Sequence, residues 1–174
     1  MANTMTKIAS ITAANSTTNT FTFTSIPQIY VDLLLLCSTR DTLTPSPTTN
    51  GVDEFIYFNG AQGTTLFSET RIYGNGSVAG TDRSSNSGYP GITLTTNTSL
   101  TSNVFGSNSL YLSQYTNTSN FKSYIADGVS ENNGSVAWQT MYAGLWRSTS
   151  AVTSLSIVAG AFFAAGSEFT LYGI

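Results

Sequence analysis

Short apolar segments with a period of two residues recur along this chain, and turn-forming residues separate them. In the segment 20–25, for example, Phe21 and Phe23 alternate with hydroxyl side chains. A period of two places successive side chains on opposite faces of an extended strand, whereas a helix needs apolar residues three and four positions apart. The pattern therefore predicts a chain built from about ten short β-strands.

The predicted strands occupy most of the chain between turn signals. We expect the first two to form a hairpin, and 29–39 to be a central strand covered on both faces. Asn59-Gly60 is a strong turn pair, so a second hairpin is expected to join 54–58 to 66–73. The predicted strands are 7–12, 20–25, 29–39, 54–58, 66–73, 92–95, 109–115, 121–127, 135–147, 154–159 and 168–172.

Two segments without an apolar period are predicted to be loops. One is 40–53, and the other is 74–90, which is rich in Gly, Ser and Asn. Loops on a rigid scaffold often carry contacts, so 74–90 is the segment expected to touch a partner. The chain ends on the apolar Ile174, which we expect to be held in a sheet or at an interface.

Composition favours the same class of fold. Ser and Thr make up about 30% of the residues, and only 9% are charged, against about a quarter in an average domain. Hydroxyl residues compete with helical hydrogen bonds, while Thr and the aromatics suit strands. The sequence therefore predicts one domain over residues 1–174, an all-β antiparallel β-sandwich with a jelly-roll-like arrangement.

Charge and hydropathy exclude several partners. The six basic residues are scattered, so no positive field is expected to hold nucleic acid. The longest apolar run, 33–37, is far shorter than a membrane helix, and the first ten residues lack the apolar core of a signal peptide. We expect synthesis in the cytoplasm without membrane insertion. The single cysteine, Cys37, is predicted to be a buried apolar residue.

Catalytic chemistry has little support in the sequence. The chain has no histidine, which removes the usual general base, the usual neutral metal ligand and a Ser-His-Asp triad. Phosphate-binding and calcium-binding loop motifs are also missing from the sequence. We predict no catalytic residue, no cofactor and no metal. A glycosidase using two of the nine acidic residues remains an alternative, and it requires two carboxyl groups roughly 5 to 9.5 Å apart in a groove.

Two side-chain features need a structural explanation. Asp32 interrupts an apolar run, so its carboxylate is expected to have a hydrogen-bonded or ion-paired partner such as Arg40 or Arg147. Exposed Tyr and Trp rings could instead line a sugar-binding groove, although aromatics at period-two positions are more often core residues.

Several motifs resemble small β-rich virion proteins of tailed bacteriophages. The first is Phe23-Thr-Ser-Ile-Pro-Gln-Ile-Tyr-Val-Asp-Leu33, followed by Ser38-Thr-Arg40. Phe58-Asn59-Gly60, Gly74-Asn-Gly-Ser77 and the ending Gly166-Ser-Glu-Phe-Thr-Leu-Tyr-Gly-Ile174 follow in the same order. The sequence departs from the commoner pattern at Asp32, where a histidine is often seen. The motif residues are Ile26, Pro27, Tyr30, Asp32, Arg40, Asn59, Gly60, Leu171, Tyr172, Gly173 and Ile174.

The resemblance implies a non-enzymatic structural role in the virion. Such proteins include capsid decoration (cement) proteins, tail or fibre components and other structural proteins. We expect a decoration protein, a homotrimer that binds and stabilises the major capsid protein lattice or other virion proteins. The alternative is a tail-fibre or tail-tip head domain that binds host-surface glycan. The chain lacks a long repetitive shaft, which favours decoration over a fibre.

Overall fold

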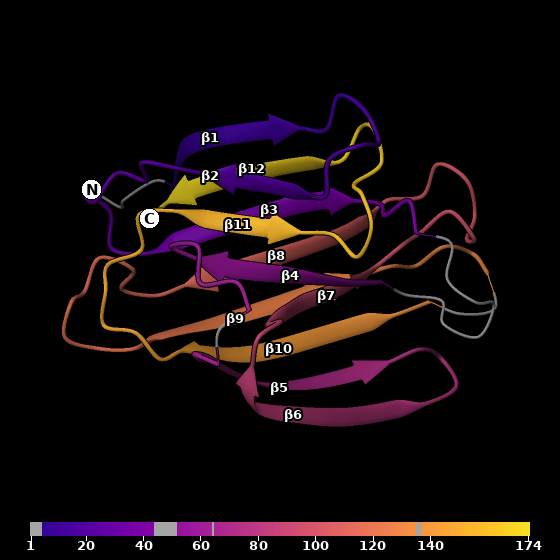
Figure 1. The fold of residues 1–174 in the computed structure, drawn as a ribbon. Coiled ribbons are helices and arrows are strands. Elements are labelled where there is room, and N and C mark those ends of the chain that lie inside the picture. The colour runs from indigo at the N-terminus through magenta and orange to yellow at the C-terminus, as the bar shows by residue number, and fades with distance from the viewer. Residues whose placement is uncertain (1–4, 44–51, 64, 135–136) are drawn as a thin grey trace.

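Two antiparallel sheets packed face to face make up the fold (Figure 1). The computed structural model describes residues 5–43, 52–63, 65–134 and 137–174, and these residues form no helix. The larger sheet contains, in spatial order, β1 (Thr6–Thr12), β12 (Glu168–Gly173), β3 (Leu33–Thr39), β8 (Gly106–Leu112), β9 (Lys122–Val129), β10 (Gln139–Trp146), β5 (Phe67–Gly74) and β6 (Ala79–Ser87). The smaller sheet contains β2 (Thr20–Phe23), β11 (Leu155–Val158), β4 (Val52–Phe58) and β7 (Gly91–Thr95). The predicted all-β antiparallel sandwich is confirmed.

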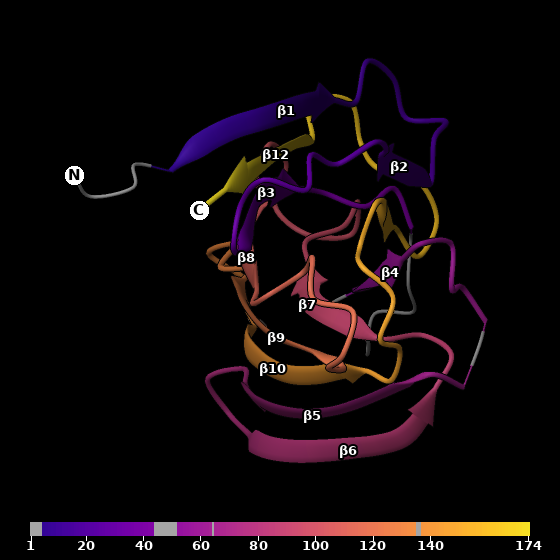
Figure 2. The same cartoon turned by 90° about the vertical axis from the view of Figure 1, so that its left-hand side faces the viewer.

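The strand pairs are nested along the chain. β1 pairs with β12, β2 with β11, β3 with β8, and β4 with β7. The first four strands thus pair in reverse order with strands of the later part of the chain, like the two arms of one long ribbon folded across both sheets. The hairpins β5–β6 and β9–β10 extend the larger sheet beyond this ribbon. Figure 2 shows the larger sheet curling around the smaller one.

The core lies between the two sheets and is rich in aromatic rings. Along β9 every second residue is buried, as a strand with one covered face requires. The ring of Phe58 lies 5.7 to 6.0 Å from those of Phe67, Tyr124 and Trp146, measured between centroids. Each fully buried ring of this kind contributes about 1.5–3 kcal/mol to folding. Cys37 is buried, as predicted.

The two predicted hairpins do not form. β1 and β2 lie in different sheets, each paired with a strand from the C-terminal part of the chain. The turn at Asn59-Gly60 exists, with φ angles of 51° and 71°, but it leads from β4 in the smaller sheet towards β5 in the larger. A turn signal reports only the local change in direction, and which strand then pairs depends on distant residues.

The prediction of a long loop over 74–90 is wrong. Residues 79–87 form β6, which pairs with β5 at the edge of the larger sheet. Among the described residues β6 is the last strand of the larger sheet and extends past the smaller one, so both of its faces are largely exposed and its side chains can be polar. A period-two apolar signal is absent because β6 has no buried face. Part of the predicted loop 40–53 lies outside the described residues.

β3 is not covered on both faces. It begins at Leu33, and Leu33, Leu35 and Cys37 point into the core while Leu36 on the other face is exposed. The run of four leucines therefore has two different environments. The exposed one belongs to the surface described below.

The C-terminal residue is held in place, as predicted. The amide of Ile174 donates to the carbonyl oxygen of Asp32, and the amides of Val31 and Asp32 both donate to the carbonyl oxygen of Ile174. No helix in the described part of the chain is long and apolar enough to cross a membrane.

Candidate functional site

The larger sheet has one face that the smaller sheet does not cover, which we call the outer face. Antiparallel register aligns the outward side chains of neighbouring strands in rows across it. One row runs through Leu36, Ser109, Asp127, Met141 and Ile72. A solvated sheet face is normally polar, with apolar residues turned inward. This row instead carries three large apolar side chains.

The neighbouring rows continue the apolar character. Tyr111 and Ile125 pair in the next row, and Val129 lies in the row on the opposite side. These three, with Leu36, Met141 and Ile72, are 37 to 52% exposed. Such a gathering of exposed apolar side chains on one face of a sheet is typical of an interaction surface.

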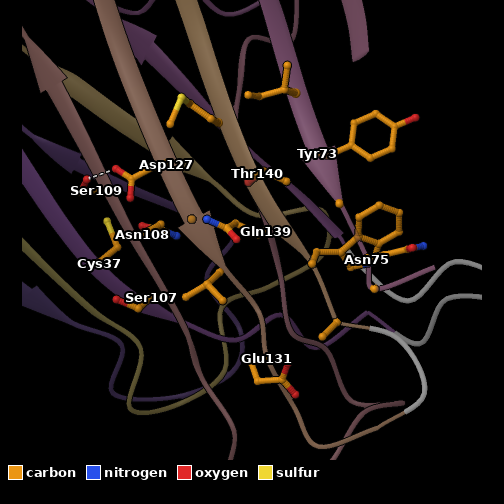
Figure 3. A pocket seen from close by; sticks show the side chains of 18 of the residues that line it. Cys37, Tyr73, Asn75, Ser107, Asn108, Ser109, Asp127, Glu131, Gln139 and Thr140 are labelled. Atoms are coloured by element: carbon orange, nitrogen blue, oxygen red, sulfur yellow. Dashed lines mark hydrogen bonds between the residues drawn. The ribbon is translucent and has the colours of Figure 1, made fainter. Parts of the chain in front are cut away.

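A groove of about 1550 Å³ crosses this face (Figure 3). Its lining reaches across the larger sheet, from β12 and β3 through β8, β9 and β10 to β5, β6 and the turn that joins them. Figure 3 shows Ser109 and Asp127 on adjacent strands, with Tyr73 and Asn75 at the side of the hairpin β5–β6 and Gln139 of β10 between the two sides. The turn and part of β6 line the groove, and a contact role for the segment 74–90 stays a prediction.

The charges of the groove are all negative among its described lining residues, which include Asp127, Glu131 and Glu168 but neither Lys nor Arg. Asp127 accepts a hydrogen bond from the hydroxyl of Ser109 at 2.5 Å. Glu131 accepts the amides of Asn132 and Asn133 through one oxygen. None of the three forms an ion pair within the described chain, where the ion pairs are those of Arg71.

A buried polar layer lies between the sheets beneath the groove. Asn108, at the groove floor, donates to the carboxyl of Glu54 at 3.2 Å, and Glu54 is fully buried. Desolvation by burial raises the pKa of Glu54 to about 7, with Asp41 nearby adding to the rise and hydrogen bonds from Thr39 and Asn108 opposing it. The other oxygen of Glu54 has no hydrogen-bond partner among the described residues.

A second, smaller cleft of about 230 Å³ lies where β5 and β6 extend beyond the smaller sheet. Arg71 is its centre, with Asp53 at 3.3 Å and Asp82 at 2.7 Å. Burial raises the pKa of both Asp53 and Glu69, although Arg71 opposes the rise at each. Glu69 accepts the amide of Gly91 at 2.7 Å. The acids of this cleft thus have structural partners, and the two-carboxylate glycosidase stays an untested alternative.

The motif residues of the virion-protein resemblance support the fold and do not form one pocket. The ring of Tyr30 covers Gly173, and the backbone of Asp32 pairs with Ile174, so the two most separated motifs contact each other. Leu171 is a core residue, and Tyr172 lines the groove. The strands bring the first and last motifs together because β12 pairs with β3.

The remaining motif residues fix loops. Ile26 is buried, and its amide donates to Thr153. The carbonyl of Pro27 accepts the hydroxyl of Tyr115. Arg40 donates to the carbonyls of Leu100, Thr101 and Val104 at 2.8 to 3.2 Å. Asn59 is hydrogen-bonded to Ala151, Thr153 and Ser154 of the loop 151–154, and Gly60 completes its turn.

Asp32 does have hydrogen-bonded partners, but they are not the predicted arginines. Its carboxylate accepts the hydroxyl of Tyr111 and, at 2.7 Å, the amide of Gln114. Arg147 instead donates to the carbonyls of Thr65 and Leu66 and to Asn86. The choice between these partners depends on tertiary geometry, which no local pattern around Asp32 reveals.

Sequence reasoning missed the outer face. β9 and β10 carry apolar side chains on both faces, so their sequence pattern does not say which of the two faces is covered. The inward side of β9 includes Lys122, whose ammonium donates to the carbonyls of Asn120 and Thr149, while Ile125 and Val129 point outward. Large apolar residues at both odd and even positions of one strand were a signal in the sequence that the exposed face is also apolar.

The architecture places the chain among all-β sandwich proteins. No protein-family model matches the chain, and no curated protein matches it. A solved β-fructofuranosidase from Schwanniomyces occidentalis, complexed with fructosyl-erythritol, is similar over 100% of this chain and 35% of its own length, at 7% identity and a TM-score of 0.29. The chain therefore spans about a third of that enzyme, and a likeness of this degree assigns no activity.

Proposed function

We propose that this protein is a structural subunit of a tailed-bacteriophage particle, of the capsid-decoration kind, and that it binds a neighbouring virion protein through its outer face. The observation that carries the proposal is the row of exposed aliphatic side chains on a sheet that a sandwich core holds rigid. Burying such side chains across an interface supplies most of the free energy of a stable contact.

The strand order supports the same proposal. The nested pairs β1·β12, β2·β11, β3·β8 and β4·β7 are the order expected of a jelly roll, the fold of many viral capsid and lectin domains. We therefore propose a jelly-roll arrangement with the hairpins β5–β6 and β9–β10 added to one sheet. The mutual contact of the Tyr30 and Gly173 motifs also fits the resemblance to virion proteins.

A decoration protein stabilises a lattice by adding buried area between subunits. An interface of standard size buries about 1,600 Å² in total. We propose a homotrimer with the major capsid protein as its partner.

The test is the copy number of this protein in purified particles, measured by quantitative mass spectrometry against the major capsid protein. Hundreds of copies per particle are expected for a decoration protein. A few dozen or fewer would move the protein to the tail, and its absence from particles would contradict a virion role.

A glycan-binding tail domain is a second candidate, and one observation favours it. The groove contains an aromatic pair, Tyr73 and Trp138, with ring centroids 5.7 Å apart, and the side-chain amides of Asn75 and Gln139 are also among its lining residues. Aromatic rings beside amide groups are suited to sugars. Binding to host lipopolysaccharide on a glycan array that Trp138→Ala abolishes would support this candidate, and an array without signal would contradict it.

A further inference from the structure

The charge of the groove restricts what can occupy the outer face. Three carboxylates, those of Asp127, Glu131 and Glu168, lie among the described lining residues without an ion-paired partner. They stand beside the exposed apolar side chains Leu36, Ile72 and Met141. An occupant must therefore offer apolar surface and tolerate a negative field.

A second copy of the chain is a poor occupant. The groove placed against its own copy would bring three carboxylates towards three others, and the whole chain carries a net charge of −3. Like charges placed together at an interface cost several kcal/mol and exclude such partners. Nucleic acid and anionic membrane surfaces are disfavoured for the same reason.

Opposite charge removes this penalty. Asp127 and Glu131 each have an oxygen for which no hydrogen bond is described, and Glu168 lies at the exposed start of β12. A Lys or Arg side chain can reach such carboxylates while its aliphatic stem packs on the apolar row. The groove is open along the sheet, which suits a segment of polypeptide.

We propose that the groove of the outer face binds a segment of another protein that carries aliphatic side chains interspersed with Lys or Arg. This proposal rests on the proposed function and names the chemistry of the virion partner. The predicted homotrimer would then use a different surface, leaving the outer face for the lattice protein.

The experiment uses the full chain and three capped twelve-residue peptides, each with four leucines separated by lysines, serines or glutamates. Binding is measured by fluorescence anisotropy at low and at high salt. The lysine peptide is expected to bind about tenfold more tightly than the serine peptide, with the glutamate peptide weakest, and the preference should shrink as salt rises.

Variants separate charge from apolar contact. The triple variant Asp127→Asn, Glu131→Gln, Glu168→Gln should bind the lysine and serine peptides equally. The charge-swapped pair Asp127→Lys, Glu168→Lys should prefer the glutamate peptide. Asp82→Asn removes the same charge from the opposite face of the sheet, where Asp82 pairs with Arg71 and lies outside the described groove lining, so it is the matched control and should leave the binding of all three unchanged.

The outcomes distinguish this proposal from the proposed function. If the three peptides bind equally and Met141→Ser with Ile72→Ser abolishes binding, the basic partner is wrong while the apolar contact face survives. If no peptide binds, the proposal that the groove binds a polypeptide segment is wrong. The copy number in particles answers the virion question separately from both results.

Discussion

At the scale of single residues, Asp32 shows how a carboxylate in an apolar run is accommodated. It accepts hydrogen bonds from the Tyr111 hydroxyl and the Gln114 amide, and so fixes the segment before β3 to β8 and to the turn that follows β8. Hydrogen bonds to a charged group contribute more than neutral ones, about 1.5–3 kcal/mol. The residue therefore acts as a structural link, which accounts for its place in the motif without any catalytic role.

Replacing Asp32 tests this link. Asp32→Ala should lower the free energy of unfolding by about 2 kcal/mol, and Tyr111→Phe by about 1 kcal/mol, because it removes one of the two hydrogen bonds. The double variant should lose less than the sum, since the two changes share a bond. Urea denaturation measures all three. Unchanged stability in Asp32→Ala would contradict the structural assignment.

Glu54 gives the fold a defined pH dependence. Its pKa in the folded state is about 7, above its ordinary value of 4.5. The contribution of the protonated carboxyl to the free energy of unfolding is fully present below pH 4.5. It is lost as the pH rises through 7, because the carboxyl then ionises in a buried site. Cys37 and Asp41 face the same region, and the pKa of each is raised. They add no cation that could compensate the buried charge.

We expect Glu54→Gln to remove most of this dependence. The variant should be more stable than the unmodified protein at pH 8, by about 3 kcal/mol at most, and similar to it at pH 4.5. Thermal unfolding between pH 4 and pH 9 measures the effect, with the exposed Glu168→Gln as the matched control. A parallel pH profile for Glu54→Gln and the unmodified protein would show that Glu54 is not the titrating group.

At the scale of elements, the segment 26–32 packs against the C-terminal end of β12. A Cβ added to Gly173 would lie 2.2 Å from the ring of Tyr30, a distance that requires the ring to move. Glycine is thus needed here for a close approach. The motif residues Tyr30 and Gly173 are explained together by this contact.

Gly173→Ala should destabilise the protein by about 2 kcal/mol through overpacking. Gly74→Ala is the matched control, because the nearest atom to its added Cβ is a carbonyl oxygen at 3.9 Å. Tyr30→Ala introduced with Gly173→Ala should cost less than the two changes summed, since it makes room for the new methyl group. Additive losses in chemical denaturation would mean that the two residues are not coupled.

Edge position explains why β6 was missed. A strand beneath the other sheet of a sandwich shows apolar alternation because one of its faces is buried, whereas β6 lies past the smaller sheet and neither of its faces is buried. Its polar sequence also protects the sheet edge from pairing with other chains. Polar strands of this kind look like loops to any method that depends on hydrophobic period.

At the scale of the whole molecule, one hydrophobic core joins both sheets. Residues of β3, β8, β9, β10 and β12 pack with residues of β2, β4, β7 and β11 in a single cluster. The nested pairing also connects the two ends of the chain, so each sheet contains strands from both halves of the chain. The prediction of one domain over residues 1–174 stays open to a direct test.

We expect a single cooperative unfolding transition. Differential scanning calorimetry should give equal calorimetric and van't Hoff enthalpies, as for a two-state domain. The Gly173→Ala variant should shift the whole transition and not a part of it. Two resolved transitions would show that the hairpin extensions β5–β6 and β9–β10 unfold as a separate unit.

The sequence by itself determined most of the strands, the sandwich class, the turn at Asn59-Gly60, the burial of Cys37 and the attachment of Ile174. These depend on local period, turn chemistry and composition. Only the tertiary structure decided that β1 pairs with β12, that Asp32 binds Tyr111, and that Ile125 and Met141 point outward. A period of two defines two faces without saying which is covered, and that depends on the pairing of strands more than a hundred residues apart.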